Sequence, residues 1–553
     1  MVMTAGPDLS KQLEVVMRYH ERSKHHFHRY APGPAQLDWA NQPDPFRRYE
    51  GAALTRLPLL AADEAPHSPS YESVYGAGAS ASTPVNFRSL SRLLEYALAL
   101  SAWKQAGEAR WALRSNPSSG NLHPTEGYLL VGGIAELGDP GLFHYAPMEH
   151  GLERRADCPP ALYARLLHAF PPHALLLGLS SVYWREAWKY GERAFLYCQH
   201  DAGHAIGSVR IAAATLGWQA LVLDGMADST IDGLLGLDRD RDFEGAEPEH
   251  AELVLALWPH GRNEGEVPLF LEPETVHALA GERWYGKANR LSSDVPVPWE
   301  AIDQVAGASR KPVDERRALV LTQGHGISVS DEGPTAGQII RQRRSLVACD
   351  GKTAIAASRF YRMLARTMPR PDAAISWEPA IHFGLFVHRV EGIDPGLYFL
   401  VRTLDKAEKL QRSMHKDFAW QLAPGCPAEL PLYLLERGDA RPVATQVSCY
   451  QDIAGEGAFS LGMIAEYQER LIMHGPSFYR RFFWEAGAIG QVLYLEAEAA
   501  GVRATGIGCF FDDPVHHVFG LRDLEFQSLY HFTVGGPVDD PRLTTLPPYE
   551  HLR

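Results

Sequence analysis

The chain contains two related helical stretches, HDAGHAIGSVRIAAATLG at residues 200–217 and WEAGAIGQVLYLEAEAAG at residues 484–501. When they are aligned, three pairs of small residues fall in step: Gly203 with Gly487, Ala213 with Ala497, and Gly217 with Gly501. Each stretch has the composition of a long buried helix. We therefore expect one such helix in each half of the chain.

A second pair of segments precedes the helices in the same order. LGDPGLFHY at 137–145 is matched by GIDPGLYFL at 392–400. A repeat of the same elements at two slowly drifting offsets indicates one ancestral domain that was duplicated. Unrelated apolar helices of similar composition are the alternative explanation, but the paired DPGL turns argue against it.

The length of 553 residues is too great for one hydrophobic core. We expect an N-terminal arm over 1–60, a first domain over 61–283 and a second domain over 313–553. Residues 284–312 turn to proline, serine and charge without a period, which predicts a linker.

Charge and composition exclude several classes of function. The net charge of -14 argues against binding to nucleic acid or to an anionic membrane. The most apolar stretch, at 174–184, is too short to span a bilayer, and the N-terminus does not read as a signal peptide. Six scattered cysteines without a CxxC pair indicate reduced thiols in a cytoplasmic protein.

The sharpest local signal is RSNPSSGNLHPTE at 114–126. Small hydroxyl and glycine residues let a ligand approach the backbone, and serine and asparagine supply donors for its oxygens. The segment lies between a helical run, LSRLLEYALALSAW at 90–103, and a strand-like GYLLVGG at 127–133; a second strand-like run, ELVLALWP, occupies 252–259. In isolation the loop would be only a polar turn.

The 114–126 segment resembles the PSxxNxxP element of flavin-dependent nitroreductases, in the form found in SagB-type and thiazole oxidase-like dehydrogenases. The segments at 19–53, 189–207, 339–347 and 490–513 resemble further parts of that family. The resemblance implies an α+β protein of two fused nitroreductase-like domains, each a mainly antiparallel sheet flanked by helices. The halves would form an internal pseudo-dimer, since members are usually homodimers with the flavin at the subunit interface.

The resemblance implies one complete FMN site, formed by both halves. The first half would contribute Arg114, Pro117, Ser118, Ser119, Gly120, Asn121 and His123. The second half would contribute Arg343, Arg344 and Ser345 to the phosphate and Gly506, Ile507 and Gly508 to the flavin edge. A basic patch at a helix start is the alternative for the arginines.

The second site, related to the first by the repeat, lacks the cofactor-binding motifs, so we expect one FMN per chain. The repeat places Asp372, Ala373, Ala374 and Ile375 where the first half has Pro117 to Gly120, and no RRS string precedes the first helical run. Two features depart from the family pattern. Val347 stands where a basic residue is frequent, and the C-terminal basic pair is missing, leaving Arg542, His551 and Arg553 as loose candidates.

Lys189 and Tyr190 are the candidate catalytic pair. In the resembling azoline dehydrogenases a Lys-Tyr pair is assigned to removing a substrate proton, and an adjacent ammonium favours the phenolate. The second half has Met473 and His474 at the matching place. The alternative is an amphipathic helix whose lysine extends to solvent while its tyrosine is buried.

Other polar residues carry weaker signals. Four histidines of the arm (His20, His25, His26 and His28) lack a ligand frame, so we expect no metal. Asp201 and His204 are expected to be structural, and no phosphate loop or convincing GxGxxG is present.

The expected activity is a dehydrogenation of a C–N or C–C bond in a small-molecule or peptide substrate. The alternatives are an NAD(P)H-dependent nitroreductase or quinone reductase and a non-catalytic partner protein.

Overall fold

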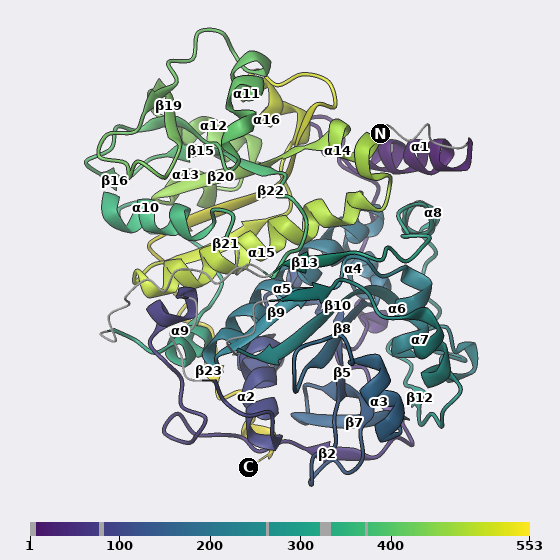
Figure 1. Cartoon of the computed structure of the whole chain (residues 1–553). Coiled ribbons are helices and arrows are strands. Elements are labelled where there is room, and N and C mark those ends of the chain that lie inside the picture. Colours follow the sequence, from purple (N-terminus) through teal and green to yellow (C-terminus); the bar gives the residue numbers. More distant parts are fainter. Residues whose placement is uncertain (1–6, 77–81, 261–264, 321–332, 371–373, 553) are drawn as a thin grey trace.

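Two seven-stranded sheets, one from each half of the chain, form the framework of the protein (Figure 1). The computed structural model describes residues 7–76, 82–260, 265–320, 333–370 and 374–552. The first sheet has the order β2-β7-β6-β5-β8-β10-β9 and the second β18-β19-β17-β15-β20-β22-β21. Neighbouring strands within each sheet are antiparallel.

The strands of the first sheet are β2 (Leu54–Arg56), β5 (Thr125–Val131), β6 (Gly141–Ala146), β7 (Gly151–Asp157), β8 (Leu175–Ser181), β9 (Trp218–Val222) and β10 (His250–Pro259). Those of the second are β15 (Ile381–Val387), β17 (Gly396–Leu400), β18 (Gln421–Leu422), β19 (Leu432–Arg437), β20 (Phe459–Glu466), β21 (Arg503–Ile507) and β22 (Phe526–Gly535). The central strands β5, β8, β15 and β20 are buried along their whole length, because elements pack on both faces of each sheet. The expected α+β class with mainly antiparallel sheets is confirmed.

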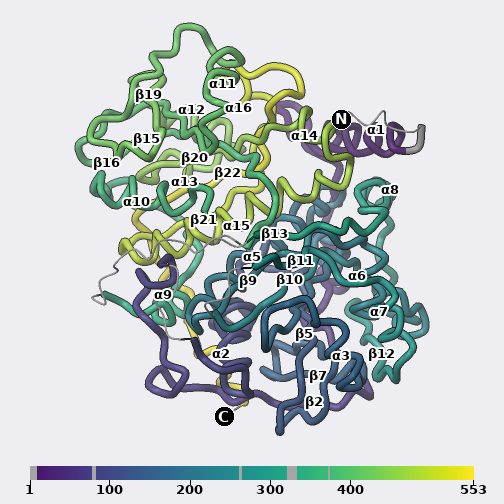
Figure 2. Tube along the Cα trace, in the orientation of Figure 1, coloured from purple at the N-terminus to yellow at the C-terminus, as the bar shows by residue number. Residues whose placement is uncertain are grey.

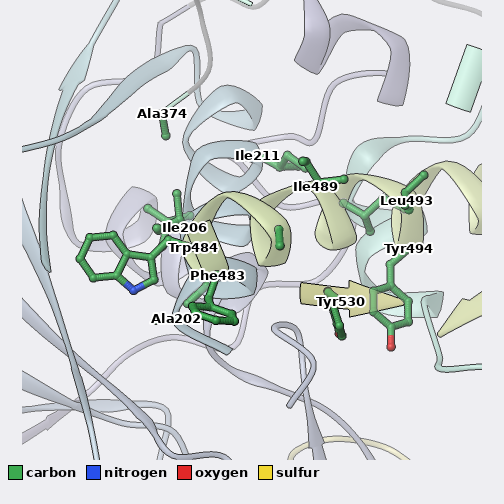
Figure 3. Close-up of a cluster of buried hydrophobic side chains, with 14 of the residues drawn as sticks. Ala202, Ile206, Ile211, Ala374, Phe483, Trp484, Ile489, Leu493, Tyr494 and Tyr530 are labelled. Carbon is green, nitrogen blue, oxygen red and sulfur yellow. The ribbon is translucent and has the colours of Figure 1, made fainter. Parts of the chain in front are cut away.

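A long helix from each half lies between the two sheets. These helices are α5 (Ala194–Thr215) and α15 (Phe478–Ala499), and Figure 2 follows them through the centre of the molecule. They cross with Gly203 against Gly487, where an added Cβ on Gly203 would lie 2.9 Å from the Gly487 Cα. The repeat-matched glycines thus meet at the pseudo-twofold axis. Figure 3 shows the side chains buried around this contact, among them Ile206, Phe483 and Ile489.

The remaining helices surround this framework. α2 (Phe87–Ala97) packs against α5, and α10 (Ala357–Arg366) packs in the same way against α15. The others are α1 (Pro7–Arg22), α3 (Pro160–Leu166), α4 (Tyr183–Tyr190), α6 (Asp228–Leu235), α7 (Pro273–Ala280), α8 (Glu300–Ala308), α9 (Ala336–Gln342), α11 (Ala407–Ser413), α12 (Arg441–Val447), α13 (Ile453–Glu456), α14 (Tyr467–His474) and α16 (Asp512–Phe519).

The short strands form small additional sheets. β3 (Leu100–Ala106) pairs with β4 (Ala109–Arg114) and with β23 (Thr544–Leu546). The other pairs are β1 (Tyr49–Glu50) with β12 (Lys287–Ala288), β11 (Glu266–Pro268) with β13 (Ala318–Val320), and β14 (Ile355–Ala356) with β16 (Val390–Glu391). The β23–β3 pair joins the C-terminal region to the first half.

Each end of the chain contacts the opposite half. The N-terminal helix α1 reaches the second half, where a His20 ring nitrogen lies 3.2 Å from the Tyr479 hydroxyl (Figure 1). The C-terminal strand β23 contacts the first half in return. Two halves that exchange their ends in this way resemble the subunits of a dimer joined into one chain.

Three local expectations differ from the structure. The apolar run at 90–103 is not one helix, because α2 ends at Ala97 and β3 begins at Leu100. Strand β2, inside the expected arm, belongs to the first sheet. The expected aperiodic linker at 284–312 contains β12 and helix α8.

Candidate functional site

A cavity of about 1060 Å³ lies between the two halves. Its wall contains residues from α5, from the loop between β4 and β5, from the segment after α9, and from β21 and the residues that follow it. The expected cofactor-binding residues all line it, as does Tyr190: Arg114, Pro117, Ser118, Ser119, Gly120, Asn121, His123, Arg343, Arg344, Ser345, Gly506, Ile507 and Gly508. Residues more than 200 positions apart in sequence are thus gathered around one space.

The PSSGN loop leaves β4 and is held against α5 by a buried carboxylate. The Ser119 backbone N–H donates to the Asp201 carboxylate at 3.1 and 3.2 Å, and the Ser119 hydroxyl donates to it at 3.1 Å. The Ser118 hydroxyl oxygen accepts a hydrogen bond from the His123 N–H at 2.8 Å. Gly120 has a φ of +57°, which a glycine adopts at little cost. Asp201 therefore positions the loop; the sequence predicted a structural role for it but not this contact.

Asp201 also lies near a second buried carboxyl, that of Glu186 on α4. Burial raises the pKa of Asp201 to about 7, although the bonds from Ser118 and Ser119 oppose the shift. Burial and the neighbouring Asp201 raise the pKa of Glu186 well above its usual range. A carboxyl that titrates near neutral pH in a cavity wall is suited to accept or release a proton.

Lys189 and Tyr190 end helix α4 beside the PSSGN loop. A Cβ added to Gly120 would lie 2.5 Å from the Tyr190 hydroxyl and 3.1 Å from the Lys189 ammonium. The ammonium also lies 5.2 Å from the centre of the Tyr190 ring. Both groups therefore converge on Gly120, although Lys189 is not part of the cavity lining.

The electrostatics of Tyr190 differ from the sequence-based expectation. Burial, followed by the neighbouring Glu186, raises the pKa of the Tyr190 phenol well above its ordinary value. Burial is the largest cause of this shift, because a buried site disfavours the charged phenolate. The neutral phenol, which can donate a hydrogen bond, is the favoured form.

A cluster of cations, here called the cationic end, lines part of the cavity. Arg343 is buried; one of its terminal nitrogens donates to the Arg114 carbonyl at 2.9 Å, while its Nε has no hydrogen-bond partner among the described residues. Burial and the charge of Arg343 lower the pKa of Arg344 to about 10. Lys104 from β3 and Arg503 from β21 lie near Arg344, and Arg503 also pairs with Asp539 at 2.6 Å. Cations that destabilise one another in this way form a receptor for an anion.

Lys104 and Arg503 are functional candidates that sequence reasoning missed. The C-terminal residues considered for phosphate binding do not contribute to the cavity. Arg542 is 86% exposed and pairs with Asp540, and neither Arg542 nor His551 lines the cavity. Arg553 lies outside the described residues. No motif marks Lys104 or Arg503. β3 pairs with β4 and β23, and β21 pairs with β22, so the packing of separate sheets brings the two residues to the cavity.

The Gly506–Gly508 segment forms another wall. A Cβ on Gly506 would collide with the Tyr530 hydroxyl, and one on Gly508 would lie 2.5 Å from the Tyr197 ring. The Gly506 N–H donates to the Tyr494 hydroxyl at 3.1 Å. Figure 3 shows Tyr494 and Tyr530 next to one another at one end of the helix contact. Only glycine leaves room for these rings beside the cavity.

One of the arm histidines, His26, lies close to two carboxylates in an arrangement that could hold a metal ion. His26, Glu21 and Asp513 offer atoms within 4.8 Å of one another. The Lys24 ammonium lies 2.9 Å from both carboxylates, so it already supplies the positive charge that a metal would bring.

Comparison with known proteins agrees with this geometry. Residues 398–536 match the model of the nitroreductase family. The crystal structure of a candidate nitroreductase from Anabaena variabilis superposes with a TM-score of 0.63 at 21% identity, covering 95% of this chain and 99% of that one. The fold is that of the nitroreductases.

A relative found by sequence comparison also carries the nitroreductase description. A candidate nitroreductase of Methanocaldococcus jannaschii is 25% identical over 187 residues, which are 33% of this chain and 83% of the relative. The chain therefore has the fold of a nitroreductase-family oxidoreductase, with a family domain in its second half. In the described residues, no helix has the length and apolar character needed to cross a membrane.

A second, smaller cavity lies at the position related to the first by the pseudo-twofold axis. It measures about 380 Å³, and its wall includes Ala374 and Ile375, the repeat counterparts of Ser119 and Gly120. Glu485, the counterpart of Asp201, is bound by Arg402 at 2.5 Å instead of by a serine loop. Asp372 and Ala373 lie outside the described residues. At the one serine position that can be compared, that of Ser119, this side has Ala374 and so lacks the hydroxyl donor.

Proposed function

We propose that this protein is an FMN-dependent oxidoreductase that binds one FMN per chain in the 1060 Å³ cavity. The observation that carries the proposal is the cationic end of that cavity, formed by Arg343, Arg344, Lys104 and Arg503, facing a space that the PSSGN loop also lines. Arginine offers planar paired donors that suit a phosphate. FMN would supply the two-electron chemistry when bound, and the protein would supply binding, orientation and proton transfer.

The residues present fit such a cofactor. Arg343 carries a buried N–H without a hydrogen-bond partner among the described residues, and Arg344 lies beside it. A phosphate would compensate both charges. The Gly506 and Gly508 backbone can approach a flat ring, because neither residue carries a side chain there. Ser118, Ser119 and Asn121 supply further polar groups along the wall.

Within this class we propose a dehydrogenase of the SagB or azoline-dehydrogenase type, acting on a small molecule or a peptide. Lys189 and Tyr190 are the proposed catalytic pair, and their convergence on Gly120 supports the assignment. Since the Tyr190 phenol is held neutral, we assign it the role of hydrogen-bond donor to the substrate. Asp201, whose pKa is about 7, is then the proposed proton acceptor in the cavity wall. The proposed location is the cytoplasm, from the scattered cysteines of the sequence.

Cofactor content tests the proposal directly. Purified full-length protein should show the visible absorbance of a flavin, or gain it on titration with FMN, at one equivalent per chain. Protein that stays colourless and does not bind added FMN would overturn both the oxidation and the reduction reading and would favour a non-catalytic partner protein. Rapid anaerobic bleaching by NADPH would assign the flavin to an NAD(P)H-dependent reductase instead of a dehydrogenase.

A further inference from the structure

Two cysteines from different loops meet at the edge of the cavity. Cys449 follows helix α12, and Cys509 follows strand β21 directly after Gly508. Their sulfur atoms lie 2.7 Å apart, within hydrogen-bonding distance, and either thiol can donate to the other. Cys509 also lines the 1060 Å³ cavity. This distance exceeds the S–S bond length of about 2.05 Å by less than about 1 Å, so a disulfide could form with little movement.

The backbone around Cys449 is held in an unusual conformation that brings the sulfurs together. Cys449 has a φ of +54° and Tyr450 a φ of +58°, a region that residues with a side chain rarely adopt. The Gln451 side-chain amide donates to the Cys509 carbonyl and to the Ser448 carbonyl, both at 2.9 Å. Strain of this kind persists only where the surrounding structure imposes it, and it gathers at functional sites.

The two thiols differ in their tendency to ionise. The hydrogen bond shared with Cys449 lowers the pKa of Cys509, and the Arg193 guanidinium acts in the same direction. The same hydrogen bond and burial raise the pKa of Cys449. The thiolate is the reactive form of cysteine, so Cys509 is the attacking member of the pair.

We propose that Cys449 and Cys509 form a redox site that reversibly closes a disulfide by exchange with a low-molecular-weight disulfide. The Cys509 thiolate attacks one sulfur of that molecule; its S–S bond breaks, and one thiol leaves with a proton. Cys449 then loses its proton and attacks the Cys509 sulfur of the mixed disulfide, which releases the second thiol. The two protein thiols are oxidised by two electrons, and the small disulfide is reduced to two thiols.

The bond would join two loops at the cavity wall. Cys509 directly follows Gly508, whose carbonyl accepts hydrogen bonds from Arg193 at 3.1 Å and from the Tyr197 hydroxyl at 3.2 Å. Cross-linking to the Cys449 loop would restrict this segment. The proposal does not depend on FMN, because the electron acceptor is the small disulfide.

The other cysteines provide an internal comparison. Cys158, Cys198 and Cys349 are buried. Cys426 is half-buried, like the pair, but its thiol donates to the Leu430 carbonyl at 3.2 Å and, among the described residues, to no sulfur. It is therefore the matched control for a thiol of similar exposure without a cysteine partner.

The test is oxidation of the full chain with oxidised glutathione, followed by alkylation, digestion and mass spectrometry. The wild-type protein should give a Cys449–Cys509 cross-linked peptide pair that reduced glutathione reverses. Cys449→Ser should accumulate glutathione on Cys509, because the resolving thiol is gone, while Cys509→Ser should leave Cys449 unmodified. Cys426→Ser should behave as the wild type.

Two results would overturn the assignment. One is glutathione that persists on Cys509 of the wild-type protein, which would show that Cys449 does not resolve it. The other is full alkylation of Cys449 and Cys509 under conditions in which Cys426 has already reacted with glutathione. Neither result bears on FMN binding, so this inference and the proposed function fail independently.

Discussion

Gly203 and Gly487 lie against each other where α5 and α15 cross, so that a Cβ on Gly203 would come within 2.9 Å of the Gly487 Cα. A Cβ on Gly487 would collide with the His200 carbonyl, which belongs to helix backbone and cannot rotate away. The two halves are therefore held at a separation that only glycine allows. Since the cavity is formed between these halves, the helix contact also sets its width.

Gly487→Ala should destabilise the protein by about 1–3 kcal/mol, the usual cost of overpacking a close contact. Thermal unfolding of the purified variant measures the effect as a lower Tm. Gly307→Ala is the matched control, because Gly307 also lies in a helix but has no atom within 4 Å of its added Cβ. Equal Tm values for the Gly487 variant and the wild type would show that the helix pair can separate without cost.

The cationic end of the cavity gives a second prediction. Arg344→Gln and Lys104→Gln should each weaken FMN binding by roughly ten- to a hundredfold, since a hydrogen bond to a charged group contributes about 1.5–3 kcal/mol. Fluorescence titration with FMN measures the Kd. Arg542→Gln should leave it unchanged, because Arg542 is 86% exposed and outside the cavity lining. Unaltered binding in both cavity variants would remove these residues from the phosphate site.

The sequence predicted the cavity best where the residues that line it belong to a contiguous motif. The PSSGN loop and the RRS segment are contiguous motifs, and the paired glycines of the repeat indicated two related helices, which the structure shows crossing at Gly203 and Gly487. The halves of the cavity could therefore be assigned from residues such as Ser118 and Arg343, both of which line it.

Contacts between residues far apart in the sequence could not be predicted from local patterns. Lys104 reaches the cavity on β3, whose first residues belong to the apolar run at 90–103 that the sequence predicted to be helical. Arg503 lies at the start of β21, in the segment assigned to the flavin edge, but its place beside Lys104 and β23 depends on tertiary contacts that the sequence did not indicate. The pKa of Tyr190 was misjudged for a related reason. Its neighbour in sequence is a cation, but its buried surroundings contain Glu186 and Asp201.

Asp201 gives a prediction about pH. Its pKa in the folded protein is about 7, against 3.8 for the free group. Between these values the unfolded chain has released the proton that the folded protein still holds, so stability falls as pH rises toward 7. Above about pH 7 both states are ionised and the loss is complete. Asp201→Asn should therefore lose less stability than the wild type between about pH 4 and pH 7.

Thermal unfolding at a series of pH values tests this difference. The introduced amide would still offer an oxygen to the Ser119 N–H, so the loop contact is conserved in the variant. Asp540→Asn is the control, since hydrogen bonds from Arg542 hold the pKa of Asp540 at about 2 and it does not titrate in this window. Parallel pH profiles for Asp201→Asn and the wild type would contradict the raised pKa and, with it, the proposed proton acceptor.

The catalytic pair can be tested with a control that the duplication itself provides. Lys189→Met and Tyr190→Phe should each lower turnover by roughly a hundred- to ten-thousandfold, the usual range for groups engaged in proton transfer. FMN occupancy should remain at the wild-type level, because neither side chain belongs to the cationic end that would hold the phosphate. Met473→Ala and His474→Phe change the corresponding positions at the end of α14, which lie in the half without the PSSGN loop. Turnover should be unaffected there; an equal loss in both pairs would mean that the substitutions act through folding and would remove Lys189 and Tyr190 from catalysis.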